Sequence, residues 1–375
     1  MSLQVTGLRS TVHDDGRVVL SLESADLGEP GPDEVVIRVE ASPINPSDLG
    51  VLLAGANPGS VEETAPKDGR AGLQVSLSAG ALAAVEGRIG KCMPVGNEGA
   101  GTVVSTGSSD AARALEGRTV AVIAGGMYAT HRKVKAADCL VFPDGTPAAD
   151  AASSFVNPLT ALGMTETMRR EGHSALVHTA AASNLGQMLN RICLTDGIEL
   201  VNIVRRPEQA ELLRGQGALH VVDSSAEDYV GDLRAALVAT GATIAFDAIG
   251  GGDQATTILA AMESALSAEG GDYNRYGSST RKQLYVYGGL DRSPTVLDRR
   301  FGMAWSVGGW LLPLFLAEIG VERADELRAR VVSELTTTFA SSYSSILNLD
   351  QMLDPDQLRA YAAMATGQKA LVTPN

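Results

Sequence analysis

The stretch SALVHTAAASNLGQMLNRICLTDGIELVNIVRR, residues 174–206, follows the order strand, small-residue turn, helix, strand and arginine pair. Residues 174–180 form a short, mostly apolar run of the kind that a buried parallel strand needs, and residues 200–204 form a second. The segment between them carries its apolar side chains on one helical face: Met188, Leu189, Ile192 and Cys193. This order predicts a βαβ unit, and ligands of such open sheets bind outside the carboxyl ends of the strands.

The turn before the helix is the predicted pyrophosphate site. The usual G-x-G-x-x-G pattern keeps only its last glycine here, as Ala181-x-Ser183-Asn184-x-Gly186. Ala and Ser are small and Asn tolerates left-handed φ, so a tight turn can still form. A helix that opens near Leu185 would offer free N–H groups and its positive dipole end to a phosphate. We therefore predict dinucleotide binding by these five residues; the alternative is an ordinary βαβ unit.

Two arginines at the end of the second strand indicate which dinucleotide binds. NAD sites usually carry an acid at this position, which accepts a hydrogen bond from the ribose 2′-hydroxyl. The chain has Arg205 and Arg206 there, and a guanidinium suits a 2′-phosphate that an acid would repel. NADP(H) is the predicted cofactor. In the alternative interpretation, both arginines are solvated residues at the start of a helix that follows at Pro207.

Composition limits the classes of partner. The chain has 375 residues, enough for two domains, and a formal net charge of −14, which argues against nucleic acid or an anionic membrane. Its three cysteines are isolated and form no CxxC pair, so neither a disulfide framework nor a structural zinc site is indicated. No signal-peptide pattern precedes Val5, and the most apolar stretch, residues 308–319, is too short to span a bilayer. We expect a soluble, cytoplasmic protein.

The rest of the chain divides into a β-rich first part and an alternating α/β part. Residues 1–155 show strand-like alternation. They are interrupted by residues 55–90, expected to be a mobile loop or a loop with a short helix near residues 79–86. After residue 174, strands alternate with helices, which implies a doubly wound parallel sheet. The later predicted elements are strands at 220–223, 243–247, 283–288, 306–312 and 369–372 and helices at 226–240, 253–268, 323–340 and 356–366.

Several segments together resemble the medium-chain dehydrogenase/reductase superfamily, and more closely its zinc-free quinone oxidoreductase branch. They are residues 34–48, Gly96-Asn-Glu-Gly-Ala-Gly101, Gly125-Gly-Met-Tyr-Ala129, Asn157-Pro-Leu-Thr-Ala161 and the dinucleotide turn. The resemblance implies an α/β chain with two domains. A GroES-like, β-rich catalytic domain would comprise residues 1–155 and 323–375, and a Rossmann domain would comprise residues 156–322. It also implies a cofactor cleft between the domains and, commonly, a homodimer.

The resemblance also bears on metal binding. Zinc-dependent members place a cysteine and a histidine where this chain has Asn45 and Asn97, and amides are poor zinc ligands. The five histidines are scattered and show no ligand spacing, so we expect them to be structural. A protein without a Lewis acid is poorly suited to oxidise simple alcohols. We therefore expect no metal, and hydride transfer to an electron-poor double bond such as a quinone or enone.

By resemblance, Asn45, Asn157 and Thr160 should lie beside the nicotinamide, where their amides and hydroxyl could orient the carboxamide or polarise a carbonyl. Loop capping is the alternative for Asn45, and a helix kink before Pro158 is the alternative for Asn157. Tyr128 could donate a proton or simply pack at the domain interface. The predicted cofactor site also includes Asp247, Gly288 and Gly289, at the ends of later strands.

The chain departs from the resembled branch in two places. Many relatives carry a tyrosine shortly after the first active-site loop, whereas residues 52–57 here have no hydroxyl. Residues 56–94 are also longer than the usual link by roughly thirty residues. We expect this insertion to cover the substrate side of the cleft as a lid; a surface insertion without contact to the site is the alternative. Two other functions stay open: a 2-enoyl thioester reductase, and a non-catalytic NADPH-binding protein.

Overall fold

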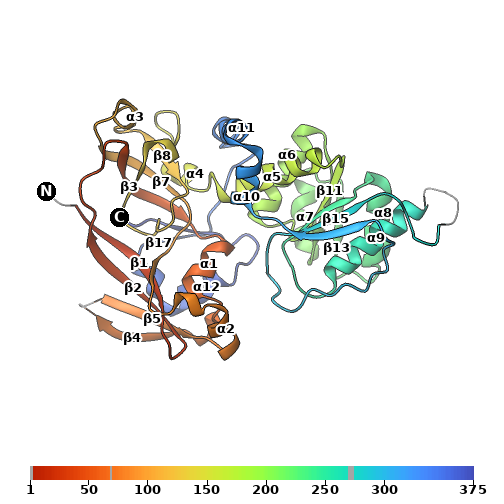
Figure 1. Cartoon of the computed structure of the whole chain (residues 1–375), viewed down its shortest axis with the longest axis horizontal. Helices are drawn as coiled ribbons and strands as arrows, with labels where there is room; N and C mark the ends of the chain where they lie inside the picture. Colours follow the sequence, from red (N-terminus) through yellow and green to blue (C-terminus); the bar gives the residue numbers. More distant parts are fainter. Residues whose placement is uncertain (1–2, 68–69, 269–273) are drawn as a thin grey trace. The chain divides into compact units, whose positions relative to one another are not determined.

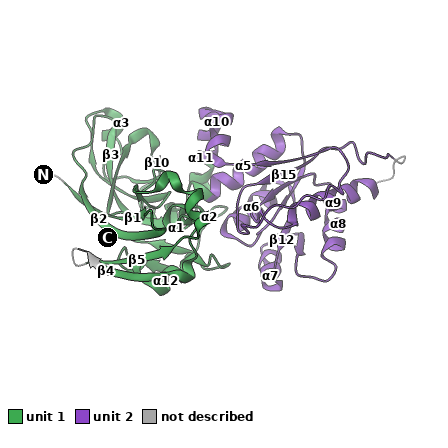
Figure 2. Ribbon diagram, turned by 60° about the horizontal axis from the view of Figure 1, so that its bottom comes forward, with its two compact units in different colours: residues 1–156, 330–375 green, residues 157–329 purple. Residues whose placement is uncertain are grey.

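The computed structural model describes residues 3–67, 70–268 and 274–375. It divides into two compact units, shown in different colours in Figure 2. Unit 1 comprises Met1–Val156 and Arg330–Asn375, and unit 2 comprises Asn157–Ala329. The boundaries predicted from the sequence are 155/156 and 322/323.

Unit 2 is built on a six-stranded sheet in which every neighbouring pair of strands is parallel. Its order is β13 (His220–Asp223), β12 (Glu199–Val204), β11 (Ala175–His178), β14 (Ile244–Asp247), β15 (Lys282–Val286) and β16 (Trp305–Gly309). The strand order therefore runs outward from β11 in one direction and from β14 in the other. Ligands of doubly wound sheets bind at the carboxyl side of such a reversal.

Helices cover both faces of this sheet. They are α5 (Val156–Arg170), α6 (Asn184–Asp196), α7 (Pro207–Gly215), α8 (Tyr229–Thr240), α9 (Gln254–Ala268) and α10 (Leu312–Ile319). Because side chains alternate along a strand, Val177 and Val201 pack into one core with α8 and α9. Their neighbour Asn202 points the other way and reaches Asn190 of α6. The predicted doubly wound parallel sheet is confirmed.

Unit 1 is built from two sheets. The first has the order β4 (Glu62–Lys67), β5 (Arg70–Ser76), β2 (Arg17–Asp26), β1 (Gln4–Val12) and β6 (Cys92–Pro94). The second has the order β10 (Leu140–Val141), β8 (Thr119–Val122), β7 (Gly99–Thr106), β3 (Glu34–Pro43), β18 (Ala370–Val372) and β17 (Ser345–Leu347), with β9 (His131–Lys135) also paired to β3. The carboxyl-terminal strand β18 thus joins a sheet formed by the start of the chain (Figure 1).

Short helices complete unit 1: α1 (Pro46–Leu53), α2 (Ala79–Ala84), α3 (Asp110–Arg113), α4 (Ala148–Ala151) and α12 (Pro355–Ala362). Single 3₁₀ turns lie at Pro58–Ser60, Glu86–Arg88, Ala136–Asp138 and Gln351–Leu353. Helix α11 (Val321–Ser333) crosses the boundary between the units. The β-rich first part of the chain is confirmed, and the mixed α/β class with it.

The insertion at residues 56–94 differs most from expectation. It was expected to have low intrinsic order, but it forms a hairpin, β4–β5, that extends the first sheet by pairing β5 with β2. Leu73 and Val75 of β5 are almost fully buried in the core of unit 1. The short helix near residue 79 is present as α2. Two sequence signals could have indicated the strands. One is the alternation of apolar residues, and the other is the hairpin dipeptide Asp68-Gly69, which lies outside the described ranges.

Other differences concern helix boundaries. The segment before the parallel sheet forms two helices, α4 and α5, and Pro158 lies in the first turn of α5, where its missing N–H costs nothing. The helix expected to reach residue 340 ends at Ser333. Strand β10 does not continue β9, because a 3₁₀ turn separates them and β10 pairs with β8 instead. Strand β1 and helix α10 were not predicted, and the helix at Pro207, present as α7, was named only in the alternative interpretation of the two arginines.

Candidate functional site

The dinucleotide turn of unit 2 connects β11 to α6. Ser183 is the N-cap of α6, and its Oγ accepts a hydrogen bond from the Gly186 N–H at 3.1 Å. The helix therefore begins at Asn184, and the residue with positive φ is Ala180 at 50°, not Asn184 as the sequence suggested. Ala181, Leu185 and Gly186 are buried, while Ser183 and Asn184 are partly exposed at the helix start. Of the five predicted residues, these two present side chains at the surface.

Gly186 allows α6 to approach the turn closely. A Cβ atom built on this glycine would lie 2.1 Å from the carbonyl oxygen of Ala181 and 2.6 Å from its carbonyl carbon. Both atoms belong to the backbone and cannot move aside easily. The last glycine of the predicted motif is therefore required for helix packing against the turn.

Arg205 and Arg206 follow the last residue of β12, and both are exposed. Arg206 is the N-cap residue of α7, and the Arg205 N–H donates to Oε1 of Gln209 at 3.0 Å. Since β12 pairs with β11, the arginines and the dinucleotide turn follow adjacent strands at the same sheet edge. Their position fits a 2′-phosphate site and equally fits the solvated helix start that was the alternative.

Asp247, at the end of β14, organises the loop on the other side of the strand-order reversal. Its buried carboxylate accepts hydrogen bonds from the Thr179 hydroxyl at 2.7 Å and from the N–H groups of Ile249 at 2.9 Å and Gly250 at 3.1 Å. A Cβ on Gly288 would lie 2.7 Å from the Ala248 carbonyl oxygen, whereas one on Gly289 would meet nothing. Asp247 and Gly288 thus shape the sheet edge from within.

A buried polar pair lies just below this edge. His178, on β11, and the Tyr287 hydroxyl are 2.7 Å apart, and their rings stack. Burial lowers the pKa of His178 to about 3, so its imidazole is neutral at physiological pH. His173 similarly pairs with the Thr243 hydroxyl at 2.7 Å. These contacts agree with the expected structural role of the histidines.

Asn157 and Thr160 lie in the first turn of α5, and both are buried. Because Asn157 is inside the helix and not before a kink, the kink alternative is wrong.

Unit 1 contains a second polar cluster, centred on the start of α1. Asn45 is its N-cap and is buried, which agrees with the capping alternative for this residue. The Asp48 carboxylate accepts hydrogen bonds from the N–H groups of Asn45 at 2.8 Å and Asn97 at 2.7 Å. Burial raises the pKa of Asp48 to about 7, against the opposing effect of these two hydrogen bonds. Asn45 and Asn97 occupy the positions that hold metal ligands in zinc-dependent relatives, and their backbone N–H groups are bound by one carboxylate.

Glu98 is the centre of the cluster, and the sequence analysis missed it. Its buried carboxylate accepts from Nδ2 of Asn45 at 2.8 Å through Oε1. Its Oε2 accepts from the N–H groups of Phe155 at 2.8 Å and Val156 at 3.0 Å, at the start of α5. Burial raises the pKa of Glu98, and the charge of Lys369 opposes that effect. Glu98 follows Asn97 in the quoted motif, but its partners are too distant in sequence to be recognised.

Lys369 precedes β18 and is only partly exposed. Its Nζ donates to the Ser153 hydroxyl at 2.7 Å and lies 5.7 Å from the centre of the Tyr343 ring. Burial lowers the pKa of Lys369 to about 8, while the negative charges of Glu98 and Asp48 act in the opposite direction. Such a lysine changes charge near physiological pH, unlike an exposed one.

Tyr128 does not fit the role of a proton donor. It is fully buried in the core of unit 1, and its hydroxyl donates to the Pro43 carbonyl oxygen at 3.1 Å. Burial and the nearby Asp48 raise the pKa of Tyr128 well above its usual value. This placement corresponds to the packing alternative, although the packing is within unit 1.

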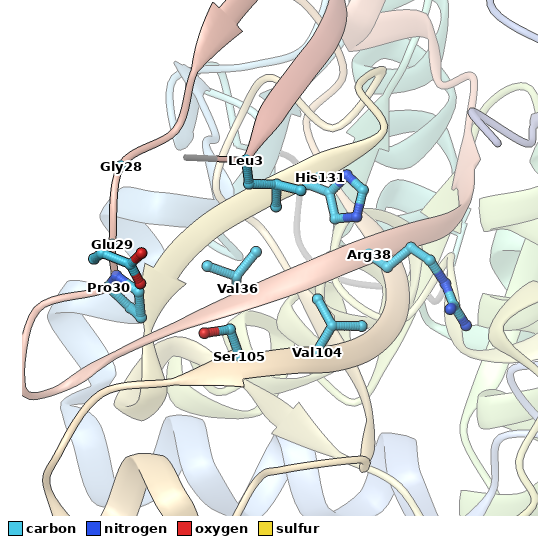
Figure 3. A pocket seen from close by; sticks show the side chains of 9 residues that line it. All are labelled: Leu3, Gly28, Glu29, Pro30, Val36, Arg38, Val104, Ser105 and His131. Carbon is cyan, nitrogen blue, oxygen red and sulfur yellow. The ribbon is translucent and has the colours of Figure 1, made fainter. Parts of the chain in front are cut away.

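Unit 1 also has a shallow surface hollow of about 380 Å³. Figure 3 shows Val36 and Val104 on its floor, with Arg38 and His131 nearby. None of the predicted catalytic or cofactor-binding residues lines it.

Among residues 3–67, 70–268 and 274–375, no group of three or more His, Cys, Asp and Glu side chains is arranged to hold a metal ion. Within the same ranges, no helix has the length and apolar character needed to cross a membrane.

No protein-family model matches the chain. Among curated proteins, it is similar to the mitochondrial enoyl-acyl-carrier-protein reductase of Xenopus tropicalis, with 30% identity over 229 residues that cover 59% of this chain and 57% of that protein. It is also similar to the synaptic vesicle membrane protein VAT-1 homolog of Rattus norvegicus, with 29% identity over 245 residues, or 64% of this chain and 52% of that protein. The chain thus spans about half the length of these relatives.

Solved structures share the fold over the whole chain. A protein assigned as an NADPH:quinone reductase from Mesorhizobium loti superposes with a TM-score of 0.74 and 24% identity, covering 100% of both chains. A second one, from Bacillus thuringiensis, gives 0.72 and 20%, again covering 100% of both chains. Etr1p, solved in complex with NADP and crotonyl-CoA, gives a TM-score of 0.67 and 18% identity, covering 99% of this chain and 100% of that one. At these identities the likeness establishes the fold.

Proposed function

Because the chain belongs, by its fold and its sequence relatives, to the medium-chain dehydrogenase/reductase superfamily, we propose that it is an NADPH-dependent reductase of electron-poor double bonds in quinones or enones. The observation that carries this proposal is the carboxyl edge of the unit 2 sheet. A small-residue turn and a helix start follow β11, and an exposed arginine pair follows the adjacent strand β12.

The residues at this edge fit NADP(H). Gly186 leaves no room for a side chain between α6 and the turn, so the helix start stays close to the strand end. The N–H groups of a first helical turn have no partners within the helix and attract phosphate. The guanidinium groups of Arg205 and Arg206 are exposed and have the charge and geometry for a 2′-phosphate. When bound, the cofactor supplies a hydride.

In this proposal, the chain's own residues orient the reactants. Asn157 and Thr160, at the start of α5, and Asn45, at the start of α1, act on the nicotinamide carboxamide or on the substrate carbonyl. A donor held at the developing enolate oxygen lowers the barrier because the negative charge appears there only in the transition state. Solvent supplies the proton, since the Tyr128 hydroxyl is already engaged by Pro43. No metal takes part, since amides stand at the ligand positions of zinc-dependent relatives.

A second candidate within this reaction type is a 2-enoyl thioester reductase. It is favoured by the likeness to the Xenopus tropicalis reductase and to Etr1p, which was solved with crotonyl-CoA. The two reactions differ in the acceptor, because an enoyl thioester of CoA carries a large phosphate-containing group and a quinone does not. The sequence also left open a non-catalytic NADPH-binding protein. The cytoplasmic location and the homodimer that the sequence predicts stay predictions.

The test is the loss of NADPH absorbance with 1,4-benzoquinone, a small cyclic enone and crotonyl-CoA, each with and without a chelator. The proposal expects turnover with the quinone or the enone that a chelator leaves unchanged. Turnover with crotonyl-CoA alone would favour the thioester reductase. NADPH binding without turnover on any acceptor would favour the non-catalytic protein, and turnover lost to the chelator and restored by zinc would contradict the metal-free mechanism.

A further inference from the structure

One buried carboxylate links two segments that carry proposed site residues. Glu98 accepts a hydrogen bond from the Asn45 side chain through one oxygen and from two N–H groups at the start of α5 through the other. The Ser42 hydroxyl also donates to the backbone carbonyl oxygen of Glu98 at 2.6 Å, which ties the backbone of Glu98 to β3. A movement of Glu98 would therefore shift the Asn45 amide and the backbone at Phe155 and Val156 together.

A buried carboxylate keeps its charge only where another charge or sufficient hydrogen bonds compensate it. The charge of Lys369 lowers the pKa of Glu98, against the effect of burial. The strand that begins beside this lysine lies against the loop before α1, because the Ile44 N–H donates to the Ala370 carbonyl oxygen at 3.0 Å. The hydrogen bond from Lys369 to Ser153 places its ammonium close to the segment that leads into α5. The carboxyl-terminal strand thus brings a cation to a cluster built by the start of the chain.

We propose that Glu98 and Lys369 form a charge couple of positioning residues, which fixes the Asn45 amide and the backbone N–H groups of Phe155 and Val156, and that hydride transfer depends on this fixed geometry. This inference rests on the proposed function. Neither residue touches the reactants in this account; both act through Asn45 and through α5. A charged acceptor makes the hydrogen bond from Asn45 stronger and more directional than a neutral one would.

The couple should respond to alkaline pH. The groups that face Lys369 are Glu98, Asp48 and the Tyr343 ring, and the pKa of Tyr343 is raised by burial, so this phenol stays neutral. Lys369 has a pKa of about 8. Above that pH it becomes neutral, Glu98 loses its counter-charge, and the Asn45 amide is held less firmly. Asp48 also changes its charge, at about pH 7, and because Lys369→Met removes only the titration of Lys369, a comparison of the two proteins separates the two effects.

The first experiment follows the Asn45 side-chain amide by NMR in the full-length protein, with asparagine labelled selectively and the signal assigned through Asn45→Ala. We expect its shift to change with a midpoint near pH 8 in the wild type, and this change to be absent in Lys369→Met. A wild-type signal that does not titrate between pH 7 and 9.5, or the same titration in Lys369→Met, overturns the inference. This measurement needs no substrate, so its result is independent of the proposed activity.

The second experiment measures kcat and KM from pH 6 to 10 with the best acceptor. We expect kcat to fall above pH 8 in the wild type, and Lys369→Met to lower it about tenfold to hundredfold without that pH dependence, because misplaced groups slow the chemical step. Because arginine stays charged at higher pH than lysine, Lys369→Arg should move the fall in kcat to higher pH. Glu98→Gln should behave like Lys369→Met, and Lys91→Met, an exposed lysine of the same unit, like the wild type.

A merely structural role would lower the amount of folded enzyme and leave the shape of the pH profile unchanged. An alkaline fall that persists in Lys369→Met, or that does not move in Lys369→Arg, would contradict the positioning role even if both variants are less active. If Lys369→Met does not fold, Lys369→Arg and Glu98→Gln carry the same test. Wild-type protein without turnover on any acceptor would refute the proposed function, and the amide titration would still decide this inference.

Discussion

The two candidate regions are built in opposite ways. The proposed phosphate-binding edge of unit 2 arises from one continuous stretch, residues 174–206, that folds into β11, α6 and β12. The cluster of unit 1 joins residues that are far apart in the chain, from Asn45 to Lys369, around the Glu98 carboxylate. The first region is exposed and presents positive charge to solvent, whereas the second is buried and must compensate its charges internally. The proposed cofactor binding thus relies on exposed charges, whereas the proposed positioning relies on buried charges that the protein itself must compensate.

The largest effect that separates the two regions is expected at the turn of unit 2. Gly186→Ala adds a Cβ that would lie 2.1 Å from a backbone oxygen, so α6 must move away from β11 and NADPH binding should be lost. Gly215→Ala, in α7, is the matched control, because nothing lies within 4 Å of a Cβ there. Cofactor affinity is measured by fluorescence titration and folding by circular dichroism. Wild-type affinity in a folded Gly186→Ala protein would refute the turn assignment.

The insertion provides the next test, within unit 1. Leu73→Ala removes a fully buried side chain from β5 and should lower the free energy of unfolding by about 2–5 kcal/mol. Val104→Ala, at a site that is 41% exposed on β7, should change it much less. Urea unfolding compares the two variants. A change below about 1 kcal/mol for Leu73→Ala would mean that the hairpin is a cover without a share in the core, as the sequence first suggested.

The buried cluster should make stability depend on pH. The pKa of Asp48 is raised from 3.8 to about 7 in the folded protein, so the folded state binds more protons than the unfolded one between these values. Its contribution to stability is fully present below about pH 4 and is lost as pH rises through about 7. Lowering pH from 8 to 5 should therefore raise the free energy of unfolding through Asp48 by roughly 2–3 kcal/mol.

Urea unfolding at both pH values measures this effect, and Asp48→Asn removes it while leaving the other titrating groups in place. The variant should be less stable overall, because its amide cannot accept both N–H bonds. An equal pH dependence in the wild type and in Asp48→Asn would show that Asp48 is ionised throughout this range.

The smallest effect is expected at the exposed edge of unit 2. Arg205→Ala or Arg206→Ala should weaken NADPH binding by about 1–3 kcal/mol and leave NADH binding nearly unchanged, since only NADPH carries the 2′-phosphate. Arg234→Ala, an exposed arginine on α8, is the control. Calorimetric titration with both cofactors measures the difference. Equal losses for NADPH and NADH would show that the arginines do not recognise the 2′-phosphate.

This contrast also explains what could be predicted from the sequence. Local patterns were sufficient for β11, α6 and β12, because strand, turn and helix signals follow one another within 33 residues. Glu98 carries no local signal, since its partners Asn45, Phe155 and Val156 are far from it in sequence. Lys369 carries none either, since the strand that follows it joins this part of the unit only when β18 pairs with β3. Tyr128 was ambiguous because a motif tyrosine can be buried or exposed, and only the structure shows its hydroxyl on Pro43.

The central claim is that this chain transfers hydride from NADPH to an electron-poor carbon. The most direct measurement uses NADPH deuterated at C4 of the nicotinamide, in its two stereoisomers, with a cyclic enone, and detects deuterium in the product by mass spectrometry. The account predicts that one isomer delivers deuterium to the β-carbon and that the new hydrogen at the α-carbon comes from solvent. Product formed without deuterium from either isomer, or no product with any quinone, enone or enoyl thioester, would contradict it.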